Sequence, residues 1–153
     1  MNSAEKTLRH IRRVNELVGE CAIEFIRRGA AHDQSKLTNA ELGPLAEIDD
    51  LIEREGQAAF GSDEYERRRQ MLKPMLEHHY ARNSHHPEHY ENGVNGMDLF
   101  DVLEMVCDWK AASERGEESS INLKAACERF GIDAQLQEII TNHCERQGWK
   151  VES

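Results

Sequence analysis

Apolar residues near the start of the chain recur at the spacing of an α-helix. Leu8, Ile11 and Val14 begin a series that returns every three or four positions for about seven turns. This pattern predicts one long amphipathic helix over about residues 4–28. Gly29 is expected to end that helix as a left-handed cap.

A second helix should open at Thr38, because Glu41 stands three residues later, which is the spacing of a capping box. The Gly43-Pro44 pair is expected to interrupt this helix soon after its start, since proline has no backbone N–H to donate. Apolar periodicity then predicts a helix over residues 44–55.

The middle of the chain alternates between helix and loop. Ser62 can cap the next helix, in which Pro74 should introduce a kink or a break. The composition of residues 81–96, rich in Asn, Gly and His, is typical of an ordered loop, and long loops in compact domains usually carry function. A helix over residues 97–113 follows, apolar over most of its circumference.

Two short helices are expected at the end of the chain. Ser120 should cap a helix over residues 121–130 that Gly131 ends, and Asp133 should cap the last helix. No segment alternates apolar and polar residues over a useful length, so no strand is expected. The sequence therefore predicts an all-α fold, a single compact domain over residues 1–153 with about six or seven helices.

Charge and composition exclude several classes of protein. Lys and Arg number 19 against 29 Asp and Glu, and the resulting charge of -10 disfavours bulk nucleic acid binding. A metal site with a few cations could still accept a small anion. No apolar run approaches a membrane span and no signal peptide is evident, so we expect a cytoplasmic protein without membrane contact. The scattered cysteines favour free thiols at mostly apolar positions: Cys21, Cys107, Cys127 and Cys144.

Histidines are concentrated in one stretch. Five of the eight lie within residues 78–109, where a His-rich loop leads into an Asp-bearing helix. Imidazole is a common metal ligand and carboxylates bind hard divalent ions, so this stretch predicts a metal site. The earlier pair His32-Asp33 and the helical His10 could complete it. Two alternatives stay open: His10 as a satisfied core histidine, and the paired histidines as an exposed tract that captures metal adventitiously.

Three acidic residues of the helix over residues 97–113 fall within one narrow arc of its surface: Asp101, Glu104 and Asp108. The arc could face a metal site, or it could be the solvated side of an amphipathic helix. The periodicity alone does not separate these two interpretations.

Taken in order, these residues resemble the HD superfamily of metal-dependent phosphohydrolases, all-helical proteins whose ligands run His, His-Asp, further His and a final Asp. The HDQSK segment, with Lys36 three residues after the aspartate, is similar to the HD-GYP-like branch. HHYARNSHHPEHYENG looks like a counterpart of that branch's His-rich segment, although Tyr80 stands where a glutamate would follow the paired histidines.

The chain also resembles a small uncharacterised family of bacterial and phage proteins. These carry HD-x-SK, RNSHHPEHY and LFD-x-LEM-x-CDWKAAS, and the likeness spans roughly residues 8–113. That family brings no established activity.

The HD resemblance implies a residue set. Metal ligands would be His10, His32, Asp33, His79 (or His78), one or two of His85, His86 and His89, and Asp108. Lys36 would contact substrate phosphate, with Arg82 as a second candidate and Asn83 beside it, while Glu104 would orient a ligand histidine. The ions would be one or two of Mn, Fe, Co, Ni, Zn or Mg.

These expectations lead to three hypotheses. The first is a metal-dependent phosphohydrolase acting on a nucleotide or another small phosphate ester, with a metal-activated water as nucleophile. The second is a catalytically silent HD-like domain that binds metal and a nucleotide or protein partner. The third is a structural helical domain with a surface His tract, and in any of these cases the chain could form a homodimer.

Overall fold

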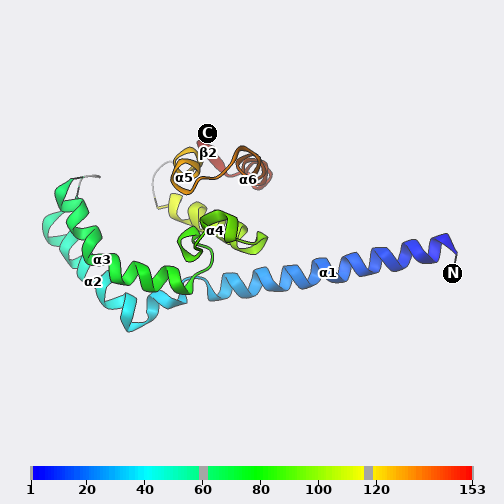
Figure 1. Ribbon diagram of the computed structural model, residues 1–153, viewed down its shortest axis with the longest axis horizontal. Coiled ribbons are helices and arrows are strands. Elements are labelled where there is room, and N and C mark those ends of the chain that lie inside the picture. Colours follow the sequence, from blue (N-terminus) through cyan, green and yellow to red (C-terminus); the bar gives the residue numbers. More distant parts are fainter. Residues whose placement is uncertain (1, 59–61, 116–118, 153) are drawn as a thin grey trace. The chain divides into compact units, whose positions relative to one another are not determined.

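The computed structural model describes residues 2–58, 62–115 and 119–152 (Figure 1). Its α-helices are α1 (Ser3–Ala31), α2 (Asn39–Glu55), α3 (Asp63–Arg82), α4 (Leu99–Ser113), α5 (Leu123–Phe130) and α6 (Ala134–Gln147). Three 3-10 turns and two strands complete the described elements: η1 (Gln34–Leu37), η2 (Pro87–His89), η3 (Gly93–Gly96), β1 (Ser120–Asn122) and β2 (Lys150–Glu152). The all-α prediction is confirmed.

Internal contacts divide the chain into two units, the first ending at His32 and the second beginning at Asp33. The prediction of one domain over the whole chain stays a prediction. The first unit is α1, which opens with a capping box in which the Asn2 side chain accepts from the Glu5 backbone N–H at 3.0 Å. None of its residues is buried.

The prediction that Gly29 ends α1 is wrong. The helix continues to Ala31, because the two alanines that follow Gly29 are the strongest helix formers. The left-handed residue comes later, at Asp33 with φ 55°. Aspartate tolerates this conformation better than most residues, since its short polar side chain can bond locally.

In the second unit, α2 and α3 pack side by side (Figure 1). The predicted break at Pro44 is wrong, because α2 runs through it without interruption. A proline near the start of a helix removes only one N–H···O bond, and packing against α3 offsets that cost. Pro74 likewise does not split α3, while the predicted cap of α3 is confirmed by the Ser62 side chain, which accepts from Tyr65 N at 3.1 Å.

The C-terminal helices surround a small apolar core. Its buried members are Met105, Val106, Ile121, Leu123, Ile132, Ile140 and Cys144. The expectation that no strand forms is wrong, because β1 pairs in parallel with β2 in the register Ile121↔Val151. Ser120 therefore belongs to a strand, and Asn122 caps α5 instead by accepting from Ala125 N at 3.0 Å. Gly131 at φ 65° and Asp133 take their predicted places as C-cap and N-cap.

The segment between α3 and α4 is fastened to α4 by the buried Asp101. Its carboxylate accepts hydrogen bonds from Ser84 Oγ at 2.6 Å, Tyr90 Oη at 2.5 Å and the Asp98 backbone N–H at 3.0 Å. The segment also packs closely on itself, because a Cβ added at Gly96 would lie 2.7 Å from Tyr90 Cβ. The long loop is thus an ordered structure, as its composition indicated.

Burial and the hydrogen bond to Asp101 raise the pKa of Tyr90 to about 12. The folded state therefore keeps the tyrosine proton above the pH at which the unfolded chain loses it, near 10.0. Since the folded state then binds more protons than the unfolded state, stability should fall as pH rises from about 10 towards 12.

Tyr90→Phe should lower the free energy of unfolding by about 1–3 kcal/mol at neutral pH, because it removes one donor from a buried carboxylate. It should also remove this part of the alkaline loss of stability. Chemical denaturation at pH 8 and pH 11 measures both effects. A variant as stable as wild type, with the same alkaline slope, would show that Asp101 does not depend on Tyr90.

Candidate metal centre

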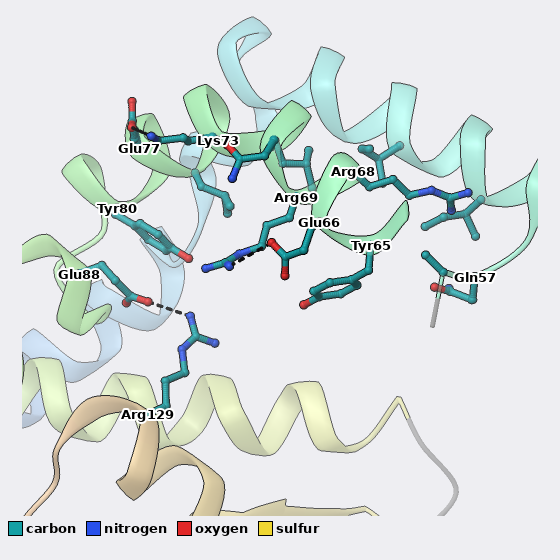
Figure 2. A pocket seen from close by; sticks show the side chains of 16 residues that line it. Gln57, Tyr65, Glu66, Arg68, Arg69, Lys73, Glu77, Tyr80, Glu88 and Arg129 are labelled. Atoms are coloured by element: carbon teal, nitrogen blue, oxygen red, sulfur yellow. Dashed lines mark hydrogen bonds and ion pairs between the residues drawn. The ribbon is translucent and has the colours of Figure 1, made fainter. Parts of the chain in front are cut away.

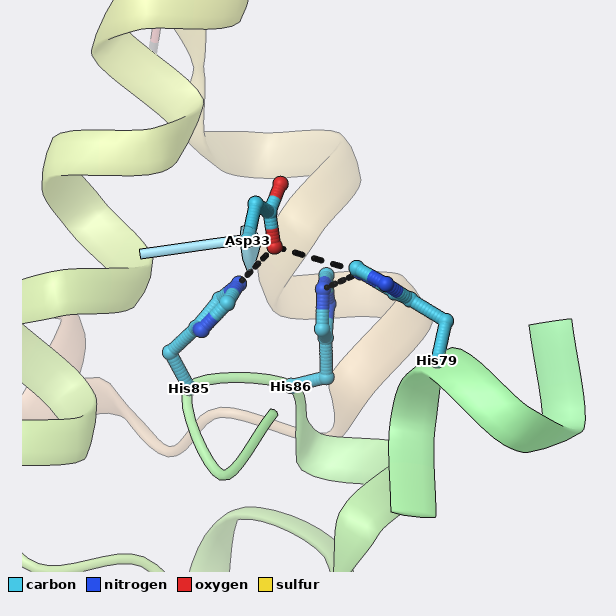
Figure 3. A group of neighbouring side chains, drawn as sticks. All are labelled: Asp33, His79, His85 and His86. Carbon is cyan, nitrogen blue, oxygen red and sulfur yellow. Dashed lines mark hydrogen bonds and ion pairs between the residues drawn. The ribbon is translucent and has the colours of Figure 1, made fainter. Parts of the chain in front are cut away.

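Four side chains from three segments of the second unit converge on one point: Asp33, His79, His85 and His86 (Figure 3). One ligand atom from each lies within 4.8 Å of all the others. Asp33 Oδ1 is 3.4 Å from His79 Nε2 and 3.5 Å from His85 Nε2. The two ring nitrogens His79 Nε2 and His86 Nε2 are 2.9 Å apart.

Local structure explains how these side chains meet. The left-handed backbone at Asp33 turns the chain sharply before η1 begins. His79 lies in the last turn of α3, and His85 and His86 follow in the segment that Asp101 holds against α4. This bend brings Asp33 into the same group as the histidines of the later segments.

The histidines of this group are largely shielded from water. His79 is 3% exposed and His85 is 2% exposed. Burial, followed by the charges of His85 and His79, lowers the pKa of His86 to about 4, although the charge of Asp108 works in the opposite direction. Metals bind the neutral imidazole. The His86 ring is already neutral at pH 7, so it does not have to lose a proton to become neutral before it binds a metal.

Further carboxylates lie behind the ligand histidines. Glu41 Oε2 is 2.8 Å from His79 Nδ1, and its other oxygen is 2.7 Å from His78 Nδ1. Glu104 Oε1 is 3.1 Å from His85 Nδ1, in the orienting position expected for it. A ligand histidine whose second ring nitrogen bonds a carboxylate is the usual arrangement in protein metal sites.

Lys36 and Asn83 also contact the group. Lys36 Nζ is 2.6 Å from Asp33 Oδ2, so the two oxygens of that carboxylate face different partners. Asn83 Nδ2 donates to Ser35 Oγ at 2.7 Å and to the His79 carbonyl at 2.8 Å. Asn83 therefore ties η1 to the end of α3, and its expected contact with substrate stays a prediction.

Asp108 lies beside the group on α4. One of its carboxylate oxygens is within 4.8 Å of a ring nitrogen of His85, and its charge acts on His86. Arg82 instead lies at the exposed end of α3, where its Nε donates to His78 Nε2 at 2.9 Å.

Three further histidines were expected as ligands: His10, His32 and His89. His89 is exposed, and its Nδ1 is 2.7 Å from the Tyr80 carbonyl. His10 is exposed on α1, and His32 is the C-cap of that helix. The roles of these three as ligands stay predictions.

The donor set fits a transition metal or zinc. Three imidazole nitrogens and one carboxylate oxygen are ligands that Zn, Fe, Co, Ni and Mn accept, whereas Mg prefers oxygen alone. Two of the three histidines are each oriented by a further carboxylate. Glu41 contacts Nδ1 of His79, and Glu104 contacts Nδ1 of His85. The four side chains could therefore hold one ion between them.

A separate cavity of about 910 Å³ lies along α2 and α3 and is closed at one end by Tyr80, Glu88 and Arg129 (Figure 2). Arg129 Nη2 is 2.9 Å from Glu88 Oε1 there. The ring of Tyr80 is also 5.1 Å from the ring of His86. The cavity thus borders the metal-binding group without containing any of its four members.

A family described as a family of unknown function (DUF5662) matches residues 1–146 of the chain. The chain belongs to this family. No curated protein and no solved structure matches it. Within the residues that the structure describes, no helix is both long enough and apolar enough to cross a membrane.

Sequence reasoning missed Glu41 and misread Asp101. The spacing of Thr38 and Glu41 matched a capping box, but Thr38 makes no side-chain cap and Glu41 turns to the two histidines. The sequence placed Asp101 on one arc of the helix with Glu104 and Asp108. In the structure, Asp101 instead accepts a hydrogen bond from Tyr90 and so holds the loop between α3 and α4. No one-dimensional signal separates these roles, because both depend on partners that lie far away in sequence.

Substitution of single ligands should separate this group from the other histidines. His85→Ala should lose a bound Zn²⁺ or Mn²⁺ that the wild-type chain retains through gel filtration, whereas His89→Ala should keep it. At a metal concentration about 100 times Kd, binding stabilises the folded state by about 2.7 kcal/mol, or about 5–10 °C in Tm for a domain of this size.

Elemental analysis of untagged protein and a melting curve with and without metal measure these effects. Equal metal content in the two variants would contradict the assignment of His85.

Proposed function

We propose that this protein is a metal-dependent phosphohydrolase of HD-like type that acts on a nucleotide or another small phosphate ester. The observation that supports it most directly is the convergence of Asp33, His79, His85 and His86 within 4.8 Å. Free thiols at all four cysteines agree with a reducing compartment, so we propose that it acts in the cytoplasm.

Phosphoester hydrolysis needs a nucleophile and a means to stabilise charge on the phosphoryl oxygens. A bound divalent ion lowers the pKa of its water to about 7 and neutralises phosphoryl charge. Lys36 is partly exposed and lies 2.6 Å from Asp33, so its ammonium can also meet a phosphate oxygen beside the ion. Glu104 holds His85 in orientation through Nδ1.

The order of residues along the chain also supports the proposal. His32-Asp33, the later histidines and Asp108 follow the HD sequence of ligands, and Asp108 lies beside His85. Tyr80, where that pattern has a glutamate, faces the neighbouring cavity rather than the ion site. Asp33, His79, His85 and His86 belong both to the ligand set that the resemblance implies and to the group that the geometry brings together.

One feature favours the second hypothesis, a catalytically silent metal-binding module. Three histidines and one aspartate supply four donors, which is the closed, four-coordinate set of a structural zinc site. A catalytic site keeps one position for water or substrate. Metal retention without turnover would therefore favour a binding role.

Turnover on a panel of phosphate esters distinguishes the two. We expect Mn²⁺-loaded or Zn²⁺-loaded protein to release phosphate or diphosphate from at least one nucleotide, and Asp33→Ala to lower the rate by at least about 10³-fold, because the site would lose its carboxylate ligand. Glu47→Gln, an exposed change on α2, serves as the matched control and should leave the rate unchanged. Circular dichroism verifies that Asp33→Ala remains folded.

Failure of every panel member with a stoichiometric ion bound would overturn the enzymatic proposal.

A further inference from the structure

Four polar side chains of the second unit form a line that ends at the ion site. Arg82 Nε is 2.9 Å from His78 Nε2, and His78 Nδ1 is 2.7 Å from Glu41 Oε1. Glu41 Oε2 is 2.8 Å from His79 Nδ1, and His79 Nε2 faces Asp33 and His86. The direction of each hydrogen bond in this line follows from the chemistry of its groups.

Arg82, at the outer end of this line, determines which ring nitrogen of His78 carries the proton. A guanidinium only donates, so His78 Nε2 must accept the hydrogen bond from Arg82. The single ring proton of His78 then lies on Nδ1, and Nδ1 donates to Glu41. His78 is therefore held as the Nδ1–H tautomer.

Glu41 in turn determines which ring nitrogen of His79 carries a proton. Its side chain has no exposure to water, and its two carboxylate oxygens lie 2.7 Å from His78 Nδ1 and 2.8 Å from His79 Nδ1. An ionised carboxylate only accepts, so neutral His79 carries its proton on Nδ1 and donates it to Glu41. Two other groups lie farther from His79 Nδ1 than Glu41 does, Asn83 Nδ2 at 3.1 Å and Ser35 Oγ at 3.3 Å. The two amide protons of Asn83 are donated to Ser35 Oγ and to the His79 carbonyl, so Nδ1 need not accept from Asn83.

The consequence falls on the other nitrogen of His79. With the proton on Nδ1, Nε2 presents its lone pair 3.4 Å from Asp33 Oδ1 and 2.9 Å from His86 Nε2. This is the nitrogen that a metal ion would bind, and the carboxylate behind the ring increases its basicity.

We propose that Glu41 is a positioning residue that fixes the metal-binding tautomer of His79, and that Arg82 supports it through His78 instead of contacting substrate. The inference rests on the proposed metal centre. It reassigns Arg82, which was the second candidate after Lys36 for contact with substrate phosphate, because the Arg82 side chain donates to His78. Glu41 therefore acts on the ion through His79 alone.

Glu41→Gln tests the first part with little change in shape. The amide offers one acceptor and one donor, so only one of the two histidines can keep its bond and His79 Nδ1 loses its carboxylate. We expect the Kd for Zn²⁺, measured by competition with a chelator, to rise about 10–100-fold. Glu47→Gln on the same helix should leave the Kd unchanged.

Long-range ¹H–¹⁵N NMR of histidine rings gives a second measurement that needs no variant and no turnover. In the metal-free wild-type chain, His78 and His79 should both be Nδ1–H tautomers. An Nε2–H tautomer at His79 would overturn the proposal, even if Glu41→Gln fails to fold. Glu41→Gln with wild-type metal affinity would do the same.

Arg82→Ala distinguishes the two roles of that residue. A positioning role predicts a Kd for Zn²⁺ raised a few-fold, with KM for any substrate unchanged at saturating metal. A substrate-binding role predicts the reverse, with unchanged metal affinity and a raised KM, and that result would overturn the second part. Tight metal binding with the expected tautomers but no turnover would instead leave this inference intact and refute only the enzymatic proposal.

Discussion

The buried carboxylate of Glu41 is the constraint on which the position of His79 in the candidate metal centre depends. A charged group removed from water costs several kcal/mol unless hydrogen bonds replace its hydration, and here His78 and His79 supply donors to both oxygens. Because Glu41 opens α2 and the two histidines end α3, this one contact fixes the relation of the two helices at the site. The orientation of the His79 ring is therefore set by a residue outside the candidate metal-binding group.

A second buried carboxylate, that of Asp101, holds the loop between α3 and α4 in place, as Glu41 holds the end of α3. Asp101 gathers Ser84, Tyr90 and its own N-cap residue, so the segment that carries His85 and His86 is held against α4 at both of its ends. His85 and His86 therefore lie in a loop that hydrogen bonds hold in place. Geometry that precise in a loop requires such support.

Helices and ligand types followed from the sequence because both are local properties. Apolar periodicity located the helices, the caps at Ser62 and Asp133 were correct, and the histidines that converge were among those chosen. Contacts between distant segments decided the rest. The spacing that marks a capping box is identical whether Glu41 bonds its own helix or the histidines of α3, and tertiary burial selected the latter. Strands of three residues are likewise too short to show a period of two.

The hydrogen bond between His79 and His86 indicates which proton an ion would displace. A hydrogen bond joins His79 Nε2 and His86 Nε2 at 2.9 Å, and one proton must lie between these two nitrogens. If Glu41 already holds the His79 proton on Nδ1, the shared proton belongs to His86 Nε2. An ion bound at His86 Nε2 would take the place of that proton, which would move to Nδ1 of the same ring because metals bind the neutral imidazole. The ring positions are set in advance by Glu41, Glu104 and the loop, and their conformational entropy is lost during folding rather than on binding, which favours affinity.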